Sequence, residues 1–368
     1  MNIHQYFDAV GEDDLTIISV SFRSASLLRQ NLALTRKLNP DTRVHWMVVQ
    51  NTPAPDNASD LQEDDPDFYV IPGPRITKRE KSNVGYGSFH HGKALNMALS
   101  YAITSHILLL DPDCFIVKDR WIREVPALMR RKQFCFWGTP YHPERLNAYN
   151  VFGRTYMYFP TAICMFIDRA RLQKNLHFGL DFTPPVRGKI NSFTYRDRIL
   201  NAAKSSRSSV GKAIAITREA GIRGLVDMFR LTNLKWAWDK RPDIGHLVYE
   251  QYHKKVKVGY TAMHYSRPFP AWFKLLKALV PQHCTAYPKR NHYWTKQTFA
   301  MLPPEVHERW EQFFIRDEPF AFHLGKVTYN PHKSDAALLA EVLSKQFGLE
   351  FEVASKPEAN KLELSKVG

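Results

Sequence analysis

Two carboxylates one residue apart, Asp111 and Asp113, stand directly after the apolar run Ile107–Leu110. A run that is apolar at every position is typical of a strand covered on both faces, as in a parallel α/β sheet. Ligands of such sheets bind beyond the carboxyl ends of the strands, where these carboxylates are expected to lie. Hard oxygen ligands suit Mg²⁺ or Mn²⁺, and such a cation in turn suits a diphosphate. The alternative is a solvated turn after a strand.

The residues before this strand, Lys81–Asn96, are expected to run from a glycine-containing loop into an amphipathic helix. Lys93 lies near the helix start, and a helix N-terminus together with a lysine is a candidate anion site. His90 and His91 lie there too. Because adjacent residues of a helix point in different directions, we expect at most one of the two to be functional.

The run from Gly92 to Val117 resembles the core of the GT-A glycosyltransferases, most closely glycosyltransferase family 2. It has the glycine, an asparagine on a helix, and an apolar strand ending in the Asp-x-Asp motif as Asp111-Pro112-Asp113. The motif alone is weak evidence, but its helix and strand context makes the resemblance specific. The resemblance implies a nucleotide-diphosphate sugar donor and Mn²⁺ or Mg²⁺ on the two aspartates. It places in the donor site Lys93, Asn96 and Asp111.

The start of the chain reads as strand, helix and strand at Leu15–Phe22, Leu27–Leu38 and Val44–Val49. Such a βαβ unit predicts a parallel sheet with a right-handed crossover. With the resemblance, the expected fold class is α/β: a GT-A, Rossmann-like, mostly parallel sheet flanked by helices, with a basic helical insert and a C-terminal helical extension. The resemblance is firm over about residues 15–117 and loose over 134–330.

The end of the second strand also matters for the donor. Members of the family carry an Asp-Asn-type pair there, which contacts the nucleotide base. This chain has Gln50-Asn51 instead, so the acidic residue is missing and base recognition can differ. By position, the residues predicted to line the nucleotide pocket are Ser21, Phe22, Arg23 and Asn51. The alternative is that they only cap their strands.

Apolar periodicity predicts the remaining elements. These are strands at Phe68–Ile71, Phe134–Gly138, Ala162–Ile167 and Val256–His264, and helices at Trp121–Arg131, Leu247–Lys254 and Ala336–Phe347. The aromatic residues Tyr156, Tyr158 and Phe159 are candidates for stacking on a sugar, although core packing is the more common role of such side chains.

A catalytic base is expected before the helix Leu247–Lys254. Inverting GT-A enzymes place an acidic base at the start of a helix that follows the acceptor-side strands, and Asp243 fits that place best. The base would take the proton of the acceptor hydroxyl as its oxygen attacks the anomeric carbon. Asp239 and Glu250 are the competing candidates, and a helix N-cap is the structural alternative for Asp243.

The last signal is the run Phe320–Lys326. Many GT-A enzymes have a C-terminal histidine that completes the metal site, with basic residues on the diphosphate nearby. The resemblance therefore implies His323 as the third metal ligand and Lys326 at the diphosphate. A lone histidine is more often structural, and His264 is the alternative ligand.

Four parts of the chain are expected: a nucleotide-sugar-binding half (1–185), a basic helical insert (186–235), an acceptor and catalytic half (236–330), and a C-terminal helix with a flexible tail (331–368). The net charge is +15, from 51 basic and 36 acidic residues, and Val186–Arg241 supplies +9 of it. An excess of this kind suits a polyanionic partner. For the insert, a surface for anionic lipid or a lipid-diphosphate acceptor competes with a solvated charged face.

The four cysteines are scattered without the spacing of a metal site, which indicates reduced, buried thiols in a cytosolic protein. No apolar run has the length of a membrane span, and the polar start of the chain is unlike a signal peptide. We therefore expect a cytoplasmic protein, with the inner face of a membrane as a candidate peripheral partner.

The function expected from these features is metal-dependent transfer of a sugar from a nucleotide-diphosphate sugar to a hydroxyl of a glycan or glycolipid acceptor, with inversion, in surface polysaccharide or glycolipid synthesis. A sugar nucleotidyltransferase is one alternative, but the first turn, Arg23–Ser26, lacks the glycines of that class. The other alternative is an RNA- or polyanion-binding protein. Because no nucleic-acid-binding motif is visible, nucleic acid is not the expected partner.

Overall fold

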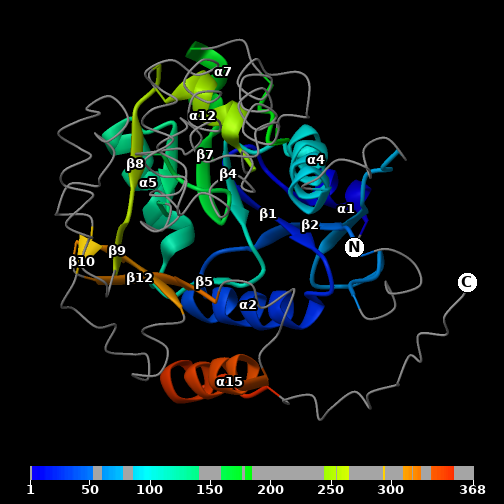
Figure 1. The fold of residues 1–368 in the computed structure, drawn as a ribbon, viewed down its shortest axis with the longest axis vertical. Helices are drawn as coiled ribbons and strands as arrows, with labels where there is room; N and C mark the ends of the chain where they lie inside the picture. The colour runs from blue at the N-terminus through cyan, green and yellow to red at the C-terminus, as the bar shows by residue number, and fades with distance from the viewer. Residues whose placement is uncertain are drawn as a thin grey trace, which may run out of the picture.

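A computed structural model of the chain places most of these apolar runs in the strands of two sheets (Figure 1). It describes residues 2–52, 60–77, 86–140, 159–175, 179–184, 244–253, 255–264, 293–294, 310–316, 318–324 and 333–351. The predicted basic insert lies wholly outside these ranges, and so do the three predicted boundaries between the parts of the chain. The division into four parts stays a prediction.

The larger sheet has seven strands in the order β3-β2-β1-β4-β7-β6-β8. The strands are β1 (Leu15–Ser21), β2 (His45–Gln50), β3 (Tyr69–Pro72), β4 (His106–Leu110), β6 (Phe136–Gly138), β7 (Cys164–Asp168) and β8 (Val258–Tyr260). The first four strands of the order pair in parallel, as do β6 and β8, whereas β7 is antiparallel to both its neighbours. The predicted α/β class with a mostly parallel sheet is confirmed.

Helices cover both faces of this sheet, which explains why its strands are apolar at every position. In β1, Ile18 and Val20 lie in one core cluster with residues of α1, α4, α7 and α12, whereas Leu15 and Ile17 lie in another with residues of α2 and α5. The helices are α1 (Ile3–Ala9), α2 (Ala25–Leu38), α4 (Tyr86–Tyr101), α5 (Trp121–Lys132), α7 (Arg169–Asn175) and α12 (His246–Tyr252).

A second sheet has five strands in the order β10-β9-β11-β12-β5. They are β5 (Cys114–Ile116), β9 (Ala262–His264), β10 (Tyr293–Trp294), β11 (Glu311–Ile315) and β12 (Glu318–His323). The single strand predicted at Val256–His264 is divided between the two sheets. The amide of Thr261 still donates to the carbonyl of Gly138 in the first sheet (2.8 Å), and the chain then enters β9.

The C-terminal helix α15 (Lys333–Phe347) packs against this second sheet. Leu339 and Leu343 of α15 share a core cluster with Phe115 of β5, Phe322 of β12 and Leu34 of α2. Figure 1 shows α2 and α15 lying one beside the other along the lower part of the molecule. The predicted C-terminal helix is therefore confirmed, and it packs against β5 and β12.

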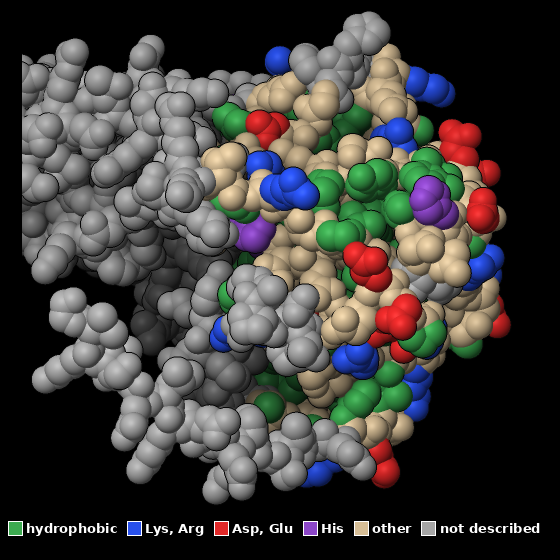
Figure 2. Space-filling view, turned by 90° about the vertical axis from the view of Figure 1, so that its right-hand side faces the viewer, with side chains coloured by type: hydrophobic (Ala, Val, Ile, Leu, Met, Phe, Trp, Pro, Cys, Tyr) green, Lys and Arg blue, Asp and Glu red, His purple; other side chains and the backbone are tan. Residues whose placement is uncertain are grey.

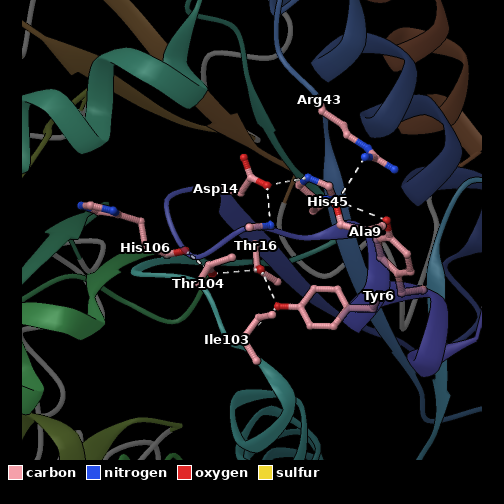
Figure 3. A network of polar contacts seen from close by, with 11 residues as sticks. Tyr6, Ala9, Asp14, Thr16, Arg43, His45, Ile103, Thr104 and His106 are labelled. Carbon is pink, nitrogen blue, oxygen red and sulfur yellow. Dashed lines mark hydrogen bonds and ion pairs between the residues drawn. The ribbon is translucent and has the colours of Figure 1, made fainter.

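Polar contacts join the amino-terminal ends of the parallel strands, at the edge opposite Asp111 (Figure 3). The hydroxyl of Thr16 in β1 lies 2.8 Å from that of Tyr6 and 3.0 Å from that of Thr104, which precedes β4. In β2, Nε2 of the buried His45 lies 3.2 Å from Oδ2 of Asp14. This edge is occupied by the protein's own side chains and anchors the sheet.

The described surface carries charges of both signs. Figure 2 shows Lys and Arg side chains interspersed with Asp and Glu over the face that it views. Residues 186–241, which supply +9 of the net charge of +15, lie wholly outside the described ranges. Among the helices in those ranges, none combines the length and the hydropathy that crossing a membrane requires.

Candidate metal and donor site

Asp111 and Asp113 lie in the short connection between β4 and β5, at the carboxyl edge of the larger sheet. The amide of Asp111 donates to the carbonyl of Ile163 beside β7 (2.8 Å), and the amide of Cys114 donates back to the carbonyl of Asp111 (2.9 Å). These bonds fix the turn at both ends. Asp113 is buried, with 6% exposed, and Asp111 is half-buried.

His323 joins these carboxylates from the second sheet. Its strand β12 pairs antiparallel with β5, so that His323 lies opposite Cys114, and the amide of Leu324 donates to the carbonyl of Asp113 (3.0 Å). Nε2 of His323 lies 3.3 Å from Oδ1 of Asp113. One ligand atom each from Asp111, Asp113 and His323 lies within 4.8 Å of the other two. The structure thus brings together the three predicted ligands.

A residue that the sequence analysis missed, Glu311, holds the other side of the imidazole. Nδ1 of His323 lies 2.7 Å from Oε2 of Glu311, its partner in the antiparallel pairing of β11 and β12. Burial disfavours the charged imidazole, but the carboxylates of Asp113 and Glu311 outweigh burial and raise the pKa of His323 well above 6.5.

This donor set fits a small divalent cation. Two carboxylates and one imidazole converge from separate segments, and oxygen with one nitrogen suits Mn²⁺ and, with fewer protein ligands, Mg²⁺. When bound there, the ion would neutralise charge on a diphosphate. Binding of a metal by Asp111, Asp113 and His323 stays a prediction.

Helix α4 brings one of the two adjacent histidines to this cluster. Nε2 of His91 lies 3.6 Å from Oδ1 of Asp111. Burial lowers the pKa of His91 to about 4, despite the opposing charge of Asp113, so the ring is neutral at neutral pH. The backbone carbonyl of the neighbouring His90 accepts a hydrogen bond from Nδ2 of Asn51 (3.4 Å). His91 therefore lies at the cluster without adding positive charge to it.

Asp60, also missed from the sequence, organises the predicted nucleotide pocket. Its buried carboxylate accepts hydrogen bonds from the hydroxyls of Ser21 and Thr52 and from the amides of Arg23 (2.6 Å) and Leu61 (2.9 Å). Arg23 has a φ of 55°, which bends the chain at the end of β1. These hydrogen bonds hold the ends of β1 and β2 together at the carboxylate of Asp60.

Asn51 also lies in this region. Its backbone amide donates a hydrogen bond to the carbonyl of Ser21 in β1 (2.8 Å). The oxygen of its side chain, Oδ1, is buried without a hydrogen-bond partner among the described residues. The guanidinium of Arg23 lies 5.8 Å above the ring of Phe22. The four predicted pocket residues Ser21, Phe22, Arg23 and Asn51 are therefore neighbours, and their binding role stays a prediction.

Asn96 and Lys93 of α4 contact protein groups. Oδ1 of Asn96 accepts from the amide of Phe182 (2.7 Å), and its Nδ2 donates to Oδ1 of Asp181 (2.8 Å). Nζ of Lys93 donates to the carbonyl of Arg75 (3.0 Å). Helix α4 begins at Tyr86, so Lys93 lies about two turns inside it and not near the helix start, as the sequence predicted. Asn96 anchors the segment 179–184, and donor binding by Asn96 and Lys93 stays a prediction.

Gly92 lets that segment cross α4 closely. A Cβ atom added at Gly92 would lie 2.5 Å from the carbonyl oxygen of Phe182 and 2.8 Å from Cα of Thr183. The same carbonyl accepts from the amide of Gly245, at the start of α12 (3.0 Å). The segment therefore ties α4, beside the metal cluster, to the helix beside which the catalytic base is predicted.

Several predicted residues fall outside the described ranges: Asp239, Asp243 and Lys326, with Tyr156 and Tyr158. Of the alternatives, Glu250 lies in α12 and His264 in β9. Phe159 packs in the core, with its ring 4.9 Å from that of Phe136, which is the more common of its two expected roles. The cysteines Cys114, Cys135 and Cys164 are free and buried, as predicted.

Comparisons with known proteins give structural neighbours only. No family model matches the chain, and no curated protein matches it. Residues 1–349 of TarS from S. aureus, in complex with UDP-GlcNAc, align with 16% identity over 50% of this chain and 52% of that one, with a TM-score of 0.32. This chain therefore spans about half of the TarS structure.

Two further neighbours are a mannosyltransferase and a galactosyltransferase. The mannosyltransferase PcManGT from Pyrobaculum calidifontis, in complex with GDP-Man and Mn²⁺, aligns with 13% identity over 77% of this chain and 88% of that one (TM-score 0.31). The galactosyltransferase LgtC, in complex with donor and acceptor sugar analogues, aligns with 10% identity over 79% and 90% (TM-score 0.31). Likeness at this level identifies neither a reaction nor a substrate for this chain.

Proposed function

We propose that this chain is a metal-dependent glycosyltransferase of the GT-A type, which moves a sugar from a nucleotide-diphosphate sugar to a hydroxyl acceptor. The observation that carries the proposal is the convergence of Asp111, Asp113 and His323 at the carboxyl edge of a mostly parallel sheet. Ligands of open α/β sheets bind at that edge. An oxygen-rich cation site there suits a diphosphate.

The donor would lie between the cluster and the ends of β1 and β2. Mn²⁺ or Mg²⁺ held by Asp111, Asp113 and His323 would stabilise the charge that develops on the departing diphosphate. Asn51 supports a place for the base, because its buried Oδ1 lacks a partner among the described residues and can accept an N–H group. Phe22 and Arg23 would line the same pocket.

On the acceptor side, Asp243 is proposed as the base that takes the proton of the attacking hydroxyl, with Asp239 and Glu250 as alternatives. Direct attack of that oxygen on the anomeric carbon would invert the configuration. The basic insert at 186–235 supports an acceptor that is anionic or presented at an anionic surface, such as a glycolipid at the inner face of a membrane. Surface polysaccharide or glycolipid synthesis is the proposed setting.

The test is thermal stabilisation by nucleotides, because it requires neither the donor sugar nor the acceptor. UDP, GDP, TDP and CMP are each added with and without Mn²⁺, and the unfolding midpoint is recorded. One nucleoside diphosphate that stabilises only with Mn²⁺ supports the proposal and identifies the donor base. Hydrolysis of the matching sugar nucleotides then identifies the sugar.

Other outcomes would contradict the proposal in different ways. The matching nucleoside triphosphates are added in the same assay, and stabilisation by one of them but by no diphosphate would favour a sugar nucleotidyltransferase. No response to any nucleotide, with salt-dependent binding of RNA, would favour a polyanion-binding protein. Flotation with anionic vesicles at low salt tests the membrane separately, and failure to float would remove only the peripheral location.

A further inference from the structure

We infer that Glu311 is a positioning residue of the metal site, whose carboxylate holds the imidazole of His323 with Nε2 turned toward Asp113. The inference rests on the part of the proposed function that assigns a divalent cation to Asp111, Asp113 and His323. It assigns to Glu311 the orientation of a ligand and no contact with the metal or with substrate.

The position of Glu311 follows from strand pairing. Glu311 and His323 are direct partners in the antiparallel pair β11–β12, and two further pairs, Gln312 with Phe322 and Phe313 with Ala321, precede a register shift. Directly opposed side chains of an antiparallel pair lie on one face of the sheet. The register therefore places the carboxylate of Glu311 beside the imidazole of His323.

The opposite face of the same strands fixes this register. The ring of Phe322 stacks between those of Phe115 (5.3 Å, 11°) and Trp310 (5.1 Å, 15°), so that β5, β12 and the residue before β11 are joined by one aromatic stack. Successive side chains of a strand point to opposite faces, so this stack lies behind His323 and Glu311. A shift of β11 along β12 would break the stack.

The position of Glu311 suits orienting the imidazole of His323 better than binding the metal. Its Oε2 lies 2.7 Å from Nδ1 of His323. Among the described residues, the candidate metal-binding group consists of Asp111, Asp113 and His323 and does not include Glu311. A carboxylate bound to Nδ1–H fixes the tautomer and leaves the lone pair of Nε2 for a metal. Nε2 lies 3.3 Å from Oδ1 of Asp113, so the ring is held between the two carboxylates with Nε2 toward the predicted metal ligands.

The experiment measures Mn²⁺ binding by the full chain in the absence of nucleotide. Free Mn²⁺ is quantified by electron paramagnetic resonance for the wild type, Glu311→Ala, Glu311→Gln and a control, Glu318→Gln. Glu318 lies at the far end of β12, and its side chain is 72% exposed beside Lys118. Pulsed measurements of ¹⁴N coupling on bound Mn²⁺ report whether the imidazole still ligates.

The expected result is a loss of about 10–100-fold in Mn²⁺ affinity for Glu311→Ala, with the ¹⁴N coupling weakened or lost. Glu311→Gln should recover most of the affinity, because its amide oxygen still accepts Nδ1–H, and Glu318→Gln should match the wild type. If Glu311→Ala does not fold, Glu311→Gln and Glu311→Leu are compared by the same two readouts, with Leu expected to lose the coupling.

Two results would overturn the inference, and they differ in what they say about the proposed function. Wild-type Mn²⁺ affinity and ¹⁴N coupling in a folded Glu311→Ala would show that Glu311 only contributes to packing, and the glycosyltransferase proposal would stand. A wild-type chain that binds no Mn²⁺ would overturn both the role of Glu311 and the metal site.

Discussion

Nε2 of His323 lies 3.3 Å from Oδ1 of Asp113, although the two residues are about 210 positions apart in the sequence. The contact depends on the pairing of β12 with β5, which sets His323 opposite Cys114. A cation site at this point would therefore combine the β4–β5 connection with strand β12, two segments that are far apart in the sequence. Removal of either ligand should weaken metal binding while leaving the strand pairing in place.

Asp113→Asn tests the carboxylate that contacts His323. We expect Mn²⁺ affinity to fall by about 100-fold or more, because loss of a ligand should exceed the 10–100-fold typical of outer partners. Mn²⁺-dependent stabilisation by the nucleoside diphosphate should disappear with it. Titration calorimetry measures both. Asp119→Asn, at an exposed carboxylate after β5, is the control, and wild-type affinity in Asp113→Asn would contradict metal binding by Asp113.

The pH dependence of metal binding follows from the raised pKa of His323. Asp113 and Glu311 stabilise the protonated ring despite its burial, and a metal must displace that proton. Affinity for Mn²⁺ should therefore rise by about tenfold per pH unit until the pH passes the raised pKa of His323, and then level off. Titrations at a series of pH values measure this slope, which His323→Gln should abolish.

The metal-free chain should show the opposite trend in stability. A pKa raised by folding contributes stability that is complete below the ordinary value of 6.5 and is lost as pH rises through the folded value. Urea unfolding of the wild type and of His323→Gln measures the difference at each pH. A constant difference across this range would contradict the assignment of the proton to His323.

Gly92→Ala tests the close crossing of segment 179–184 over α4. The new Cβ would meet backbone atoms of Phe182 and Thr183, which yield less readily than side-chain tips. Overpacking costs about 1–3 kcal/mol, and alanine returns up to about 1 kcal/mol of helix propensity. We expect a net loss of about 1–2 kcal/mol in urea unfolding. Gly179→Ala, where a Cβ meets no atom within 4 Å, is the matched control.

Asp60→Asn tests the carboxylate that joins the ends of β1 and β2. An amide cannot accept all the donors that now converge on Asp60, so buried donors lose partners at a cost of about 1–3 kcal/mol in total. Urea unfolding measures the loss, and nucleotide affinity should fall with it. Asp67→Asn, which breaks an exposed pair with Arg36, should change stability by less than about 1 kcal/mol.

Asp243→Asn tests the proposed base. Donor binding should persist, whereas the rate of sugar transfer should fall by about 10²–10⁴-fold, because the amide cannot take the proton of the acceptor. Nucleotide binding and transfer are measured on the same preparation. Unchanged turnover would move the role to Asp239 or Glu250.

The sequence predicted those site residues whose position depends on local pattern. Asp111 and Asp113 follow an apolar strand, and the end of such a strand is at the ligand-binding edge whatever the rest of the fold does. Even α1, which was missed, has a local signal: Asn2 and Gln5 form a capping box in which Asn2 accepts from the amide of Gln5 and Gln5 accepts from that of Asn2.

Residues placed by contacts between elements were not predictable in the same way. Glu311 reaches His323 through the pairing of β11 with β12, which contains a register shift between Phe313 and Phe314, so the spacing of the two residues in the sequence does not reveal that they are partners. Asp60 lies in the acidic stretch between Asp56 and Asp67, where the sequence does not distinguish one carboxylate from its neighbours. The anchoring role of Asn96 depends on where segment 179–184 crosses α4.

The pairing of β5 with β12 also sets an order of events during synthesis of the chain. Asp111 and Asp113 leave the ribosome when about 210 residues remain before His323, an interval of about 10–40 s at ordinary rates of translation. Throughout that interval β5 lacks its neighbour β12, and the two carboxylates lack the predicted third ligand, His323. A nascent chain can therefore form its first parallel strands early, whereas the predicted cation site is complete only after β12 has been synthesised and has paired with β5.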